Sequence, residues 1–269
     1  MNLRDELIET LIKAKIPSPR LESDIILRHC APNYPTYSDD EYKEAKAFLA
    51  RRINHEPIDK IIGVKEFYKY EFIVNQDVLS PRPDTETLVE SIIELVDEND
   101  NFRIIDLGTG SGCILLSILK DCSNATGVGI DISSKAIDVA LKNAKKLNIE
   151  DRVDFVNKSW LDINEAIGCF DIVVSNPPYI SKDEMDSLDA EVKKYDPITA
   201  LTDNNDGLDC YRQIANISPK ILKKDGFLVL EVGYNQANSV CDIFTNNNFK
   251  IVKIVQDLSG INRCIILKK

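Results

Sequence analysis

The stretch FRIIDLGTGSGCILLSILK, residues 102–120, decides the fold, because an apolar run, a glycine-rich loop and a helical apolar pattern follow one another directly. Gly108, Gly110 and Gly112 let the backbone turn tightly and approach a ligand without interference from a Cβ atom. A dinucleotide-binding loop would place its third glycine at position 113, where this chain has Cys113, so the spacing disfavours NAD. A tight turn without a ligand is the alternative at this point.

The rest of the chain beyond this stretch repeats the same succession of strand-like and helical patterns. Short apolar runs are separated by segments with apolar residues at helical spacing. Alternation of this kind predicts an α/β fold with a mainly parallel sheet and helices on both faces. The runs that follow FRIIDL are ATGVGID, RVDFV, FDIVVS, FLVLEV, FKIVKI and RCIILK.

The first 62 residues have a different pattern. Apolar residues recur there at helical spacing and prolines punctuate the connections, which predicts a small helical bundle. Ser38, with Glu41 three residues later, is typical of a capping box at the start of a third helix. We therefore expect a helical domain over residues 1–65.

Two short segments connect the two regions. EFYKYEFIVN, residues 66–75, alternates in polarity and predicts a strand or a hairpin, and LSPRPDTE, residues 79–86, carries two prolines that stiffen a connector. We expect a hairpin and proline linker over residues 66–84 and the α/β domain over residues 85–269.

Composition narrows the class of protein. The chain has 269 residues, and its 33 basic against 44 acidic residues give a net charge of −11, which disfavours binding to a phosphate backbone. The seven cysteines are scattered and read as small core residues in a reducing compartment. Two histidines, His29 and His55, offer little for a zinc site or a histidine-based triad, so we expect no metal.

Neither end of the chain nor any interior stretch suggests a membrane. The amino terminus has acidic residues and periodic apolar ones, unlike a signal peptide, and no stretch reaches the roughly 18 apolar residues of a membrane span. We expect a cytoplasmic protein without membrane contact.

The second apolar run ends in an acidic residue. Asp131 closes ATGVGID, where a carboxylate at the carboxyl end of a strand can accept hydrogen bonds from both ribose hydroxyls of a nucleoside. It can also cap the helix that begins near Ser133. The two roles are compatible.

The fourth apolar run, FDIVVS, leads into Asn176, Pro177, Pro178 and Tyr179. Methyl transfer to a planar amide or aniline nitrogen requires the nitrogen lone pair to line up with the bond that breaks, although that lone pair is delocalised. The side-chain oxygen of Asn176 and the carbonyl of Pro177 can accept its two N–H bonds, and the Tyr179 ring can lie against the planar group. A Pro-Pro turn with Asn176 as a local turn former is the alternative reading.

The glycine loop and Asp131 together resemble the S-adenosylmethionine site of the Rossmann-like class I methyltransferases. That resemblance implies that the cofactor is S-adenosylmethionine, that its amino-acid part lies against the loop, that Asp131 holds its ribose, and that Asp106 orients the loop. Trp160, the single tryptophan, follows the third run, where the family places a residue beside the adenine. A core aromatic is the competing explanation for Trp160. The loop residues concerned are Gly108, Thr109, Gly110, Ser111 and Gly112.

Asn-Pro-Pro-Tyr resembles the motif of methyltransferases that act on adenine N6, cytosine N4 or a protein glutamine amide. Collinear segments across roughly residues 56–265 favour the last of these, because together they resemble the PrmC/HemK family of release factor glutamine N5-methyltransferases. The segments are EPIDKIIGVKEFYKYEF, LSPRPDTETLVE, DLGTGSG, SNPPYI, ALTDNNDGLDCYRQI, FLVLEVGYNQ and QDLSGINR.

The resemblance implies a fold, a substrate and a partner. The fold would be a Rossmann-like methyltransferase sheet with an antiparallel strand near the C-terminus. The substrate would be the glutamine of the Gly-Gly-Gln motif in class 1 peptide chain release factors, bound by Asn176, Pro177, Pro178 and Tyr179, with Asn176 also touching the cofactor. The helical domain and linker would contact the release factor, and we expect a monomer that binds no nucleic acid.

Two alternatives to this function stay open at the level of sequence. One is an adenine N6-methyltransferase acting on nucleic acid, which the negative charge and the short helical domain disfavour. The other is a cofactor-binding module without catalysis. The sequence departs from the family in YDPITAL, where aspartate replaces the commoner glutamate, and in GIDIS; the roles of Arg82, Asp84, Thr85 and Glu231 are left open.

Overall fold

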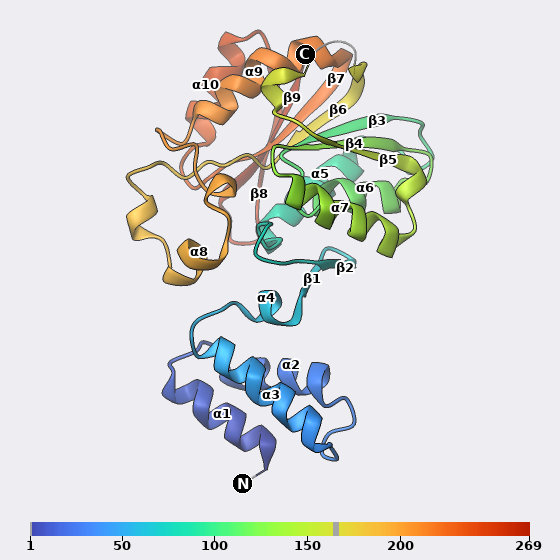
Figure 1. Cartoon of the computed structure of the whole chain (residues 1–269). Coiled ribbons are helices and arrows are strands. Elements are labelled where there is room, and N and C mark those ends of the chain that lie inside the picture. The colour runs from blue at the N-terminus through green and yellow to red at the C-terminus, as the bar shows by residue number, and fades with distance from the viewer. Residues whose placement is uncertain (1, 164–166) are drawn as a thin grey trace. The chain divides into compact units, whose positions relative to one another are not determined.

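The computed structural model describes residues 2–163 and 167–269 of the chain (Figure 1). The contacts divide the chain into two compact units. The first consists of residues up to 64 together with 189–195, and the second of residues 65–188 and 196–269. Each unit is described by itself.

The first unit is a helical bundle. Its helices are α1 (Leu3–Lys13), α2 (Pro19–Cys30), α3 (Asp39–Arg52) and the short α4 (Ile58–Ile62). Leu3, Leu7 and Leu11 recur every four residues on α1 and are fully buried, so one stripe of this helix faces the core of the bundle. The helical bundle expected from the sequence is present.

The capping box at the start of α3 is confirmed. Ser38 Oγ accepts a hydrogen bond from the backbone N–H of Glu41 at 3.2 Å, and the Glu41 carboxylate accepts one from the backbone N–H of Ser38 at 2.6 Å. Two N–H groups that the first turn of a helix leaves without partners are thereby satisfied.

A short helix far along the chain, α8 (Ala190–Tyr195), belongs to this first unit. The buried Arg52 guanidinium joins Glu22 of α2 at 2.6 Å to Glu191 of α8 at 2.9 Å. A buried arginine requires such paired acceptors, because an unpaired charge there would be costly. The expected α/β domain over residues 85–269 includes this segment, whereas its contacts group it with the helical unit.

The second unit is built on a seven-stranded sheet in the order β5-β4-β3-β6-β7-β9-β8. Neighbouring strands from β5 to β7 pair in parallel, and β9 pairs antiparallel with both β7 and β8. The mainly parallel sheet with an antiparallel strand near the C-terminus is therefore confirmed, and each apolar run forms the strand expected. The strands are β3 (Arg103–Leu107), β4 (Thr126–Asp131), β5 (Val153–Asn157), β6 (Phe170–Ser175), β7 (Leu222–Glu231), β8 (Lys250–Gln256) and β9 (Asn262–Lys268).

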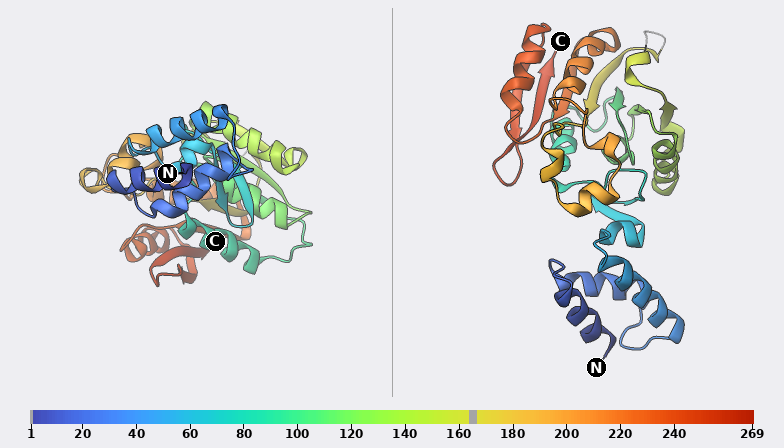
Figure 2. Two further views of the ribbon diagram at one scale, coloured as in Figure 1. Left: turned by 90° about the horizontal axis from the view of Figure 1, so that it is seen from below. Right: turned by 60° about the vertical axis from the view of Figure 1, so that its left-hand side comes forward.

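Helices cover both faces of this sheet, which is why its central strands are apolar on both sides. One layer contains α5 (Glu86–Leu95), α6 (Cys113–Asp121) and α7 (Ser134–Leu147), and the other contains α9 (Asp209–Ile221) and α10 (Ala237–Asn246). Consecutive residues of β3 alternate between the layers: Ile104 packs with the first and Ile105 with the second. Figure 2 shows α10 in red and α7 in green on opposite sides of the sheet.

The segment before the sheet forms a hairpin from β1 (Val64–Phe67) and β2 (Tyr70–Ile73). Tyr68 has a positive φ of 56° and lies in the turn between the strands, so the segment forms two short strands and not one continuous strand. Phe67 and Phe72 are buried and join the core of the first helix layer. Of the two readings, the hairpin is the one observed.

Six of the seven cysteines are buried, as expected of small core residues, while Cys169 is exposed. Within residues 2–163 and 167–269, no helix combines the length and the apolar character needed to cross a membrane.

Candidate functional site

The topology of the sheet brings the expected site residues together at the carboxyl ends of its parallel strands. Strands β3, β4, β5 and β6 run parallel, so their carboxyl ends meet there. After β3 the chain builds β4 and β5 on one side and then returns to β6 on the other, which makes the β3–β6 boundary a switch point, the usual ligand position in such sheets. Ser175 at the end of β6 donates a hydrogen bond to the Leu107 carbonyl at 2.6 Å, so the glycine loop and the Asn-Pro-Pro-Tyr segment start side by side.

The glycine loop between β3 and α6 has a conformation that requires glycine. Gly108, Gly110 and Gly112 have φ values of 80°, 55° and 80°, a region that other residues rarely adopt. A Cβ on Gly108 would also lie 3.2 Å from the Trp160 ring, and one on Gly112 would lie 2.9 Å from Leu116. The loop is therefore shaped by backbone conformation and by close packing together.

Asp106 is the second-last residue of β3, just before the loop, and is completely buried. Its Oδ2 accepts a hydrogen bond from the Thr109 hydroxyl at 2.7 Å, so the carboxylate orients the loop as the resemblance implies. Its Oδ1 has no hydrogen-bond partner among the described residues. The pKa of Asp106 is raised to about 7, mainly by burial; the Thr109 hydrogen bond opposes the rise and the nearby Asp131 charge adds to it.

Asp131 ties the glycine loop to the start of α7. Its Oδ2 accepts from the backbone N–H of Gly110 and its Oδ1 from the backbone N–H of Ser133, each at 2.9 Å. The side chain that caps α7 is Ser133, whose Oγ accepts from Ala136 at 3.2 Å, so Asp131 does not cap the helix directly. Each carboxylate oxygen keeps a further lone pair for a ligand hydroxyl. Burial raises the pKa of Asp131, and the two backbone hydrogen bonds oppose that shift.

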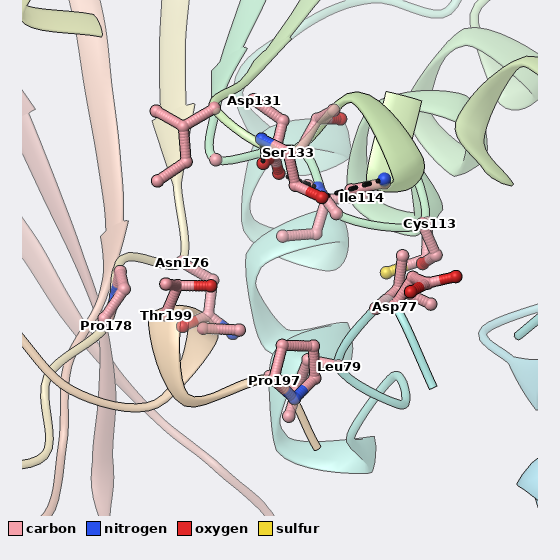
Figure 3. A pocket seen from close by; sticks show the side chains of 18 of the residues that line it. Asp77, Leu79, Cys113, Ile114, Asp131, Ser133, Asn176, Pro178, Pro197 and Thr199 are labelled. Carbon is pink, nitrogen blue, oxygen red and sulfur yellow. Dashed lines mark hydrogen bonds between the residues drawn. The ribbon is translucent and has the colours of Figure 1, made fainter. Parts of the chain in front are cut away.

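These elements enclose a pocket of about 250 Å³. Figure 3 shows Asp131 and Ser133 toward one end of it and Asn176, Pro178 and Thr199 lower down. The pocket is lined by every residue expected to contact the cofactor except Gly112, which lies immediately before α6. The expected residues that line it are Gly108, Thr109, Gly110, Ser111, Asp131, Trp160, Asn176 and Pro178.

Trp160 lies on the wall of the pocket and is packed against the second helix layer at the same time. It begins a short 3-10 turn after β5, and its indole N–H donates to Gln213 Oε1 of α9 at 2.9 Å. The hydrogen bond fixes the ring plane beside Gly108. The two readings of Trp160, pocket residue and packing residue, are thus both compatible with its position.

Only two of the four residues of the Asn-Pro-Pro-Tyr segment line the pocket. Asn176 and Pro178 line the pocket, whereas Pro177 is buried and Tyr179 packs against the core of the second helix layer without lining the pocket. The Tyr179 hydroxyl donates to Glu231 Oε1 at 3.3 Å, and its carbonyl accepts from Gln236 at 2.8 Å. Burial raises the pKa of the Tyr179 hydroxyl, so this group stays protonated and able to donate.

Glu231 at the end of β7 is a buried carboxylate next to this segment. The pKa of Glu231 is raised to about 7, mainly by burial, while the Thr85 and Tyr179 hydroxyls and the positive charge of Arg263 oppose the rise. Arg263 on β9 in turn contacts Asp84 and Asp257, each at 3.2 Å. The roles left open therefore include charge pairing with Arg263, for the buried Glu231 and for the exposed Asp84.

Sequence reasoning did not assign several residues that line the pocket. Residues 77–82, between the hairpin and α5, form one wall; the buried Ser80 Oγ there has no hydrogen-bond partner among the described residues, as a group awaiting a polar ligand would. Arg82 pairs with the buried Asp196 at 2.8 Å, which gives the unusual aspartate of YDPITAL a structural partner. The two prolines of LSPRPDTE, which indicate a rigid segment, are the sequence feature that could have pointed to this wall. Pro197, Thr199, Ala200 and Gln213 also line the pocket, and no local pattern marks them.

Comparisons with known proteins agree with this geometry. A family model described as a methyltransferase domain matches residues 98–263. The chain is 38% identical over 279 residues to the release factor glutamine methyltransferase of Fusobacterium nucleatum, an alignment that covers 100% of this chain and 78% of that protein.

Two further comparisons concern length and fold. The chain is 40% identical over 286 residues to a bifunctional methyltransferase of Rickettsia typhi, covering 96% of this chain and 55% of that protein, so it spans about half the length of that relative. The solved structure of the hMettl16 catalytic domain in complex with the MAT2A 3'UTR hairpin 6 has a TM-score of 0.58 and 15% identity, covering 87% of this chain and 82% of that one. At that identity the likeness concerns the fold alone.

Proposed function

The chain belongs to the family of release factor glutamine methyltransferases, and we propose that it transfers a methyl group from S-adenosylmethionine to the side-chain nitrogen of a glutamine in class 1 peptide chain release factors. The glutamine is the one of the Gly-Gly-Gln motif. The observation that carries the proposal is that Asn176 opens into the same pocket as the glycine loop and Asp131.

The pocket has suitable groups for both the nucleoside and the amino-acid part of S-adenosylmethionine. Asp131 keeps lone pairs for the two ribose hydroxyls beyond its bonds to Gly110 and Ser133. Gly108 allows close approach beside the Trp160 ring, against which an adenine can lie. The loop from Thr109 to Ser111 would contact the amino-acid part, with Gly112 holding the turn, and Ser80 Oγ offers an unused polar group. The cofactor supplies a sulfonium-bound, electrophilic methyl group.

Asn176 and Pro177 would orient the nucleophile. The Asn176 side-chain oxygen and the Pro177 carbonyl would accept the two N–H bonds of the glutamine amide and turn its nitrogen lone pair toward the methyl group. The bound cofactor would supply the methyl group and keep the electron pair of the broken S–C bond on sulfur, and the amide nitrogen held by Asn176 and Pro177 would release its proton to solvent after transfer. Pro178 lines the pocket and would limit the space for the amide. The resemblance implies that the Tyr179 ring also contacts the amide, although Tyr179 does not itself line the pocket.

The first unit and the linker would dock the body of the release factor, as the resemblance implies for this family. The acidic net charge of −11 disfavours a nucleic-acid substrate for the same pocket. We therefore place the protein with the protein-modifying members of the Asn-Pro-Pro-Tyr methyltransferases and expect it to act as a monomer.

Transfer of labelled methyl from S-adenosylmethionine tests this function. Three acceptors are compared: a class 1 release factor, the same factor with the Gly-Gly-Gln glutamine replaced by alanine, and duplex DNA. We expect label on the intact factor alone. Label on DNA would assign the protein to the nucleic-acid methyltransferases, and equal label on both release factors would refute the proposed target residue.

A further inference from the structure

The hydroxyl of Ser80 is a buried polar group without a partner in the protein. Ser80 is 5% exposed, and its Oγ makes no hydrogen bond within residues 2–163 and 167–269. A hydroxyl withdrawn from water in this way is destabilising, and most buried polar groups do have a partner. Because Ser80 also lines the pocket, a ligand bound there can supply the missing hydrogen-bond partner.

The segment around Ser80 holds this hydroxyl in place. Val78, two residues earlier, is buried in a cluster with residues of α7. Arg82, two residues later, pairs with a buried aspartate at 2.8 Å. Pro81 fixes its own φ and restricts Ser80 to extended backbone conformations. Ser80 therefore lies on a wall of the pocket that is anchored on both sides.

Ser80 lies away from the end of the pocket that is expected to hold the ribose. Figure 3 shows Leu79, the residue before Ser80, well away from Asp131. Thr85, five residues beyond Ser80, also lines the pocket and hydrogen-bonds to Asn176 at 3.2 Å. Since Asn176 is expected at the methyl group that is transferred, this wall lies on the side where the amino-acid part of the cofactor would be.

The amino-acid part ends in a carboxylate, and the glycine loop offers this anion few N–H donors. The N–H groups of Gly108 and Thr109 both donate to the Ile130 carbonyl, at 2.8 Å and 2.9 Å. The N–H of Gly110 donates to the carboxylate at the end of β4, and that of Gly112 donates to the Thr109 carbonyl. Unlike a phosphate-binding loop, this loop has most of its N–H groups committed within the protein. The carboxylate therefore needs donors from elsewhere in the pocket.

The start of α6 favours an anion in the pocket. Cys113 and Ile114, the first two residues of this helix, line the pocket. The N–H groups in the first turn of a helix have no partner within the helix and carry partial positive charge. The unpartnered hydroxyl of Ser80 adds a side-chain donor to the same pocket.

We propose that the Ser80 hydroxyl donates a hydrogen bond to the carboxylate of S-adenosylmethionine, and that the start of α6 supplies positive potential to the same group. An ionised carboxylate can only accept, so Ser80 must donate to it. Ser80 is thus a cofactor-binding residue outside the glycine loop. This inference rests on the proposed function for the identity of the cofactor.

Calorimetric titration with three ligands tests the contact. S-adenosylmethionine carries the carboxylate, decarboxylated S-adenosylmethionine lacks only that group, and methylthioadenosine lacks the whole amino-acid part. We expect Ser80→Ala to raise the Kd for S-adenosylmethionine about tenfold to a hundredfold, as the loss of a hydrogen bond to a charged group does. The Kd values for the other two ligands should change less than about twofold. An unchanged Kd for S-adenosylmethionine, or an equal loss with decarboxylated S-adenosylmethionine, would overturn the proposal.

Ser117→Ala is the matched control. The Ser117 hydroxyl is also buried and without a partner in the described part of the chain, but Ser117 lies on α6 and does not line the pocket. Its Kd values for all three ligands should equal those of the wild type. Without ligand, both variants should unfold at the wild-type temperature or above it, because each loses a buried hydroxyl that made no hydrogen bond. A ligand-free Ser80→Ala protein that unfolds at a clearly lower temperature would show that the hydroxyl has a structural partner, and would also overturn the proposal.

The titrations also separate this inference from the proposed function. A wild-type protein that binds S-adenosylmethionine through Ser80 but transfers no methyl to a release factor would count against the proposed function alone. A protein that methylates a release factor but whose affinity for S-adenosylmethionine is insensitive to Ser80→Ala would refute the inference alone. A wild-type protein that does not bind S-adenosylmethionine would refute both.

Discussion

Asn176 is the residue on which the proposed chemistry depends most. Asn176→Ala removes one acceptor for the substrate amide but little of the pocket around the nucleoside, so kcat should fall about a hundredfold or more while the S-adenosylmethionine Kd changes less than about threefold. Steady-state kinetics and calorimetry measure the two quantities. Asn124→Ala, a change at an exposed position, is the control. Near-normal turnover of Asn176→Ala would remove Asn176 from the mechanism.

Asp131 should have the opposite profile. Asp131→Ala removes the acceptors for the ribose hydroxyls and the bonds to Gly110 and Ser133, so the Kd for S-adenosylmethionine should rise about tenfold to a hundredfold. Asp138→Ala removes an acidic charge from an exposed position on α7 and should bind normally. If Asp131→Ala binds the cofactor as tightly as the wild type, Asp131 serves only to shape the loop.

Individual site residues could be predicted from the sequence where the adjacent residues form a recognisable pattern. The glycines, Asp131 and Asn176 could be found because each follows a recognisable apolar run. The hydrogen bond between Asn176 and Thr85 could not be predicted, because the two residues lie on separate segments and meet only where the end of β6 lies beside the start of α5.

The glycine loop is the element whose conformation can be tested most directly. Gly108→Ala places a Cβ 3.2 Å from Trp160 at a φ of 80°, whereas Gly260→Ala has a similar φ of 78° and no atom within 4 Å of its Cβ. Both variants should lose about 1 kcal/mol of stability from backbone strain. Only Gly108→Ala should also weaken S-adenosylmethionine binding, by about tenfold, because the loop and Trp160 must separate. Equal cofactor affinity in the two variants would contradict this assignment.

The elements of the sheet could be predicted because each strand is a short apolar run between helical patterns. Strand order and the helix α8 could not be predicted in the same way. The sequence around Glu191 gives no local sign that this carboxylate binds Arg52, so the assignment of residues 189–195 to the first unit follows from a long-range ion pair. The sequence predicts only a stiff linker around residues 77–82. That these residues form a wall of the pocket depends on the packing of the hairpin, which no local pattern indicates.

At the scale of the whole molecule, two buried carboxyls make stability depend on pH. Asp106 and Glu231 have pKa values raised to about 7 by burial, above ordinary values of 3.8 and 4.5. The folded state then binds protons more tightly than the unfolded state, so the stabilisation is complete below the ordinary values and is lost as pH rises through about 7. The free energy of unfolding should fall by about 1 kcal/mol or more between about pH 5 and pH 8.

Denaturant titrations across this range measure the dependence, and Glu231→Gln tests its origin. The variant removes one of the two titrating groups, so its free energy of unfolding should depend less on pH than that of the wild type and should be equal or higher at about pH 8. A wild-type stability that rises from about pH 5 to pH 8 would contradict the assigned shifts.

The central claim is that this pocket methylates one glutamine nitrogen, and tandem mass spectrometry of the product tests it most directly. A class 1 release factor is incubated with S-adenosylmethionine and the wild-type protein, digested, and sequenced through the Gly-Gly-Gln peptide. We predict a single added methyl group on the side chain of that glutamine, and none after incubation with Asn176→Ala for the same time. A methyl group on another residue, or an unmodified peptide from a wild-type protein that binds the cofactor, would contradict the account.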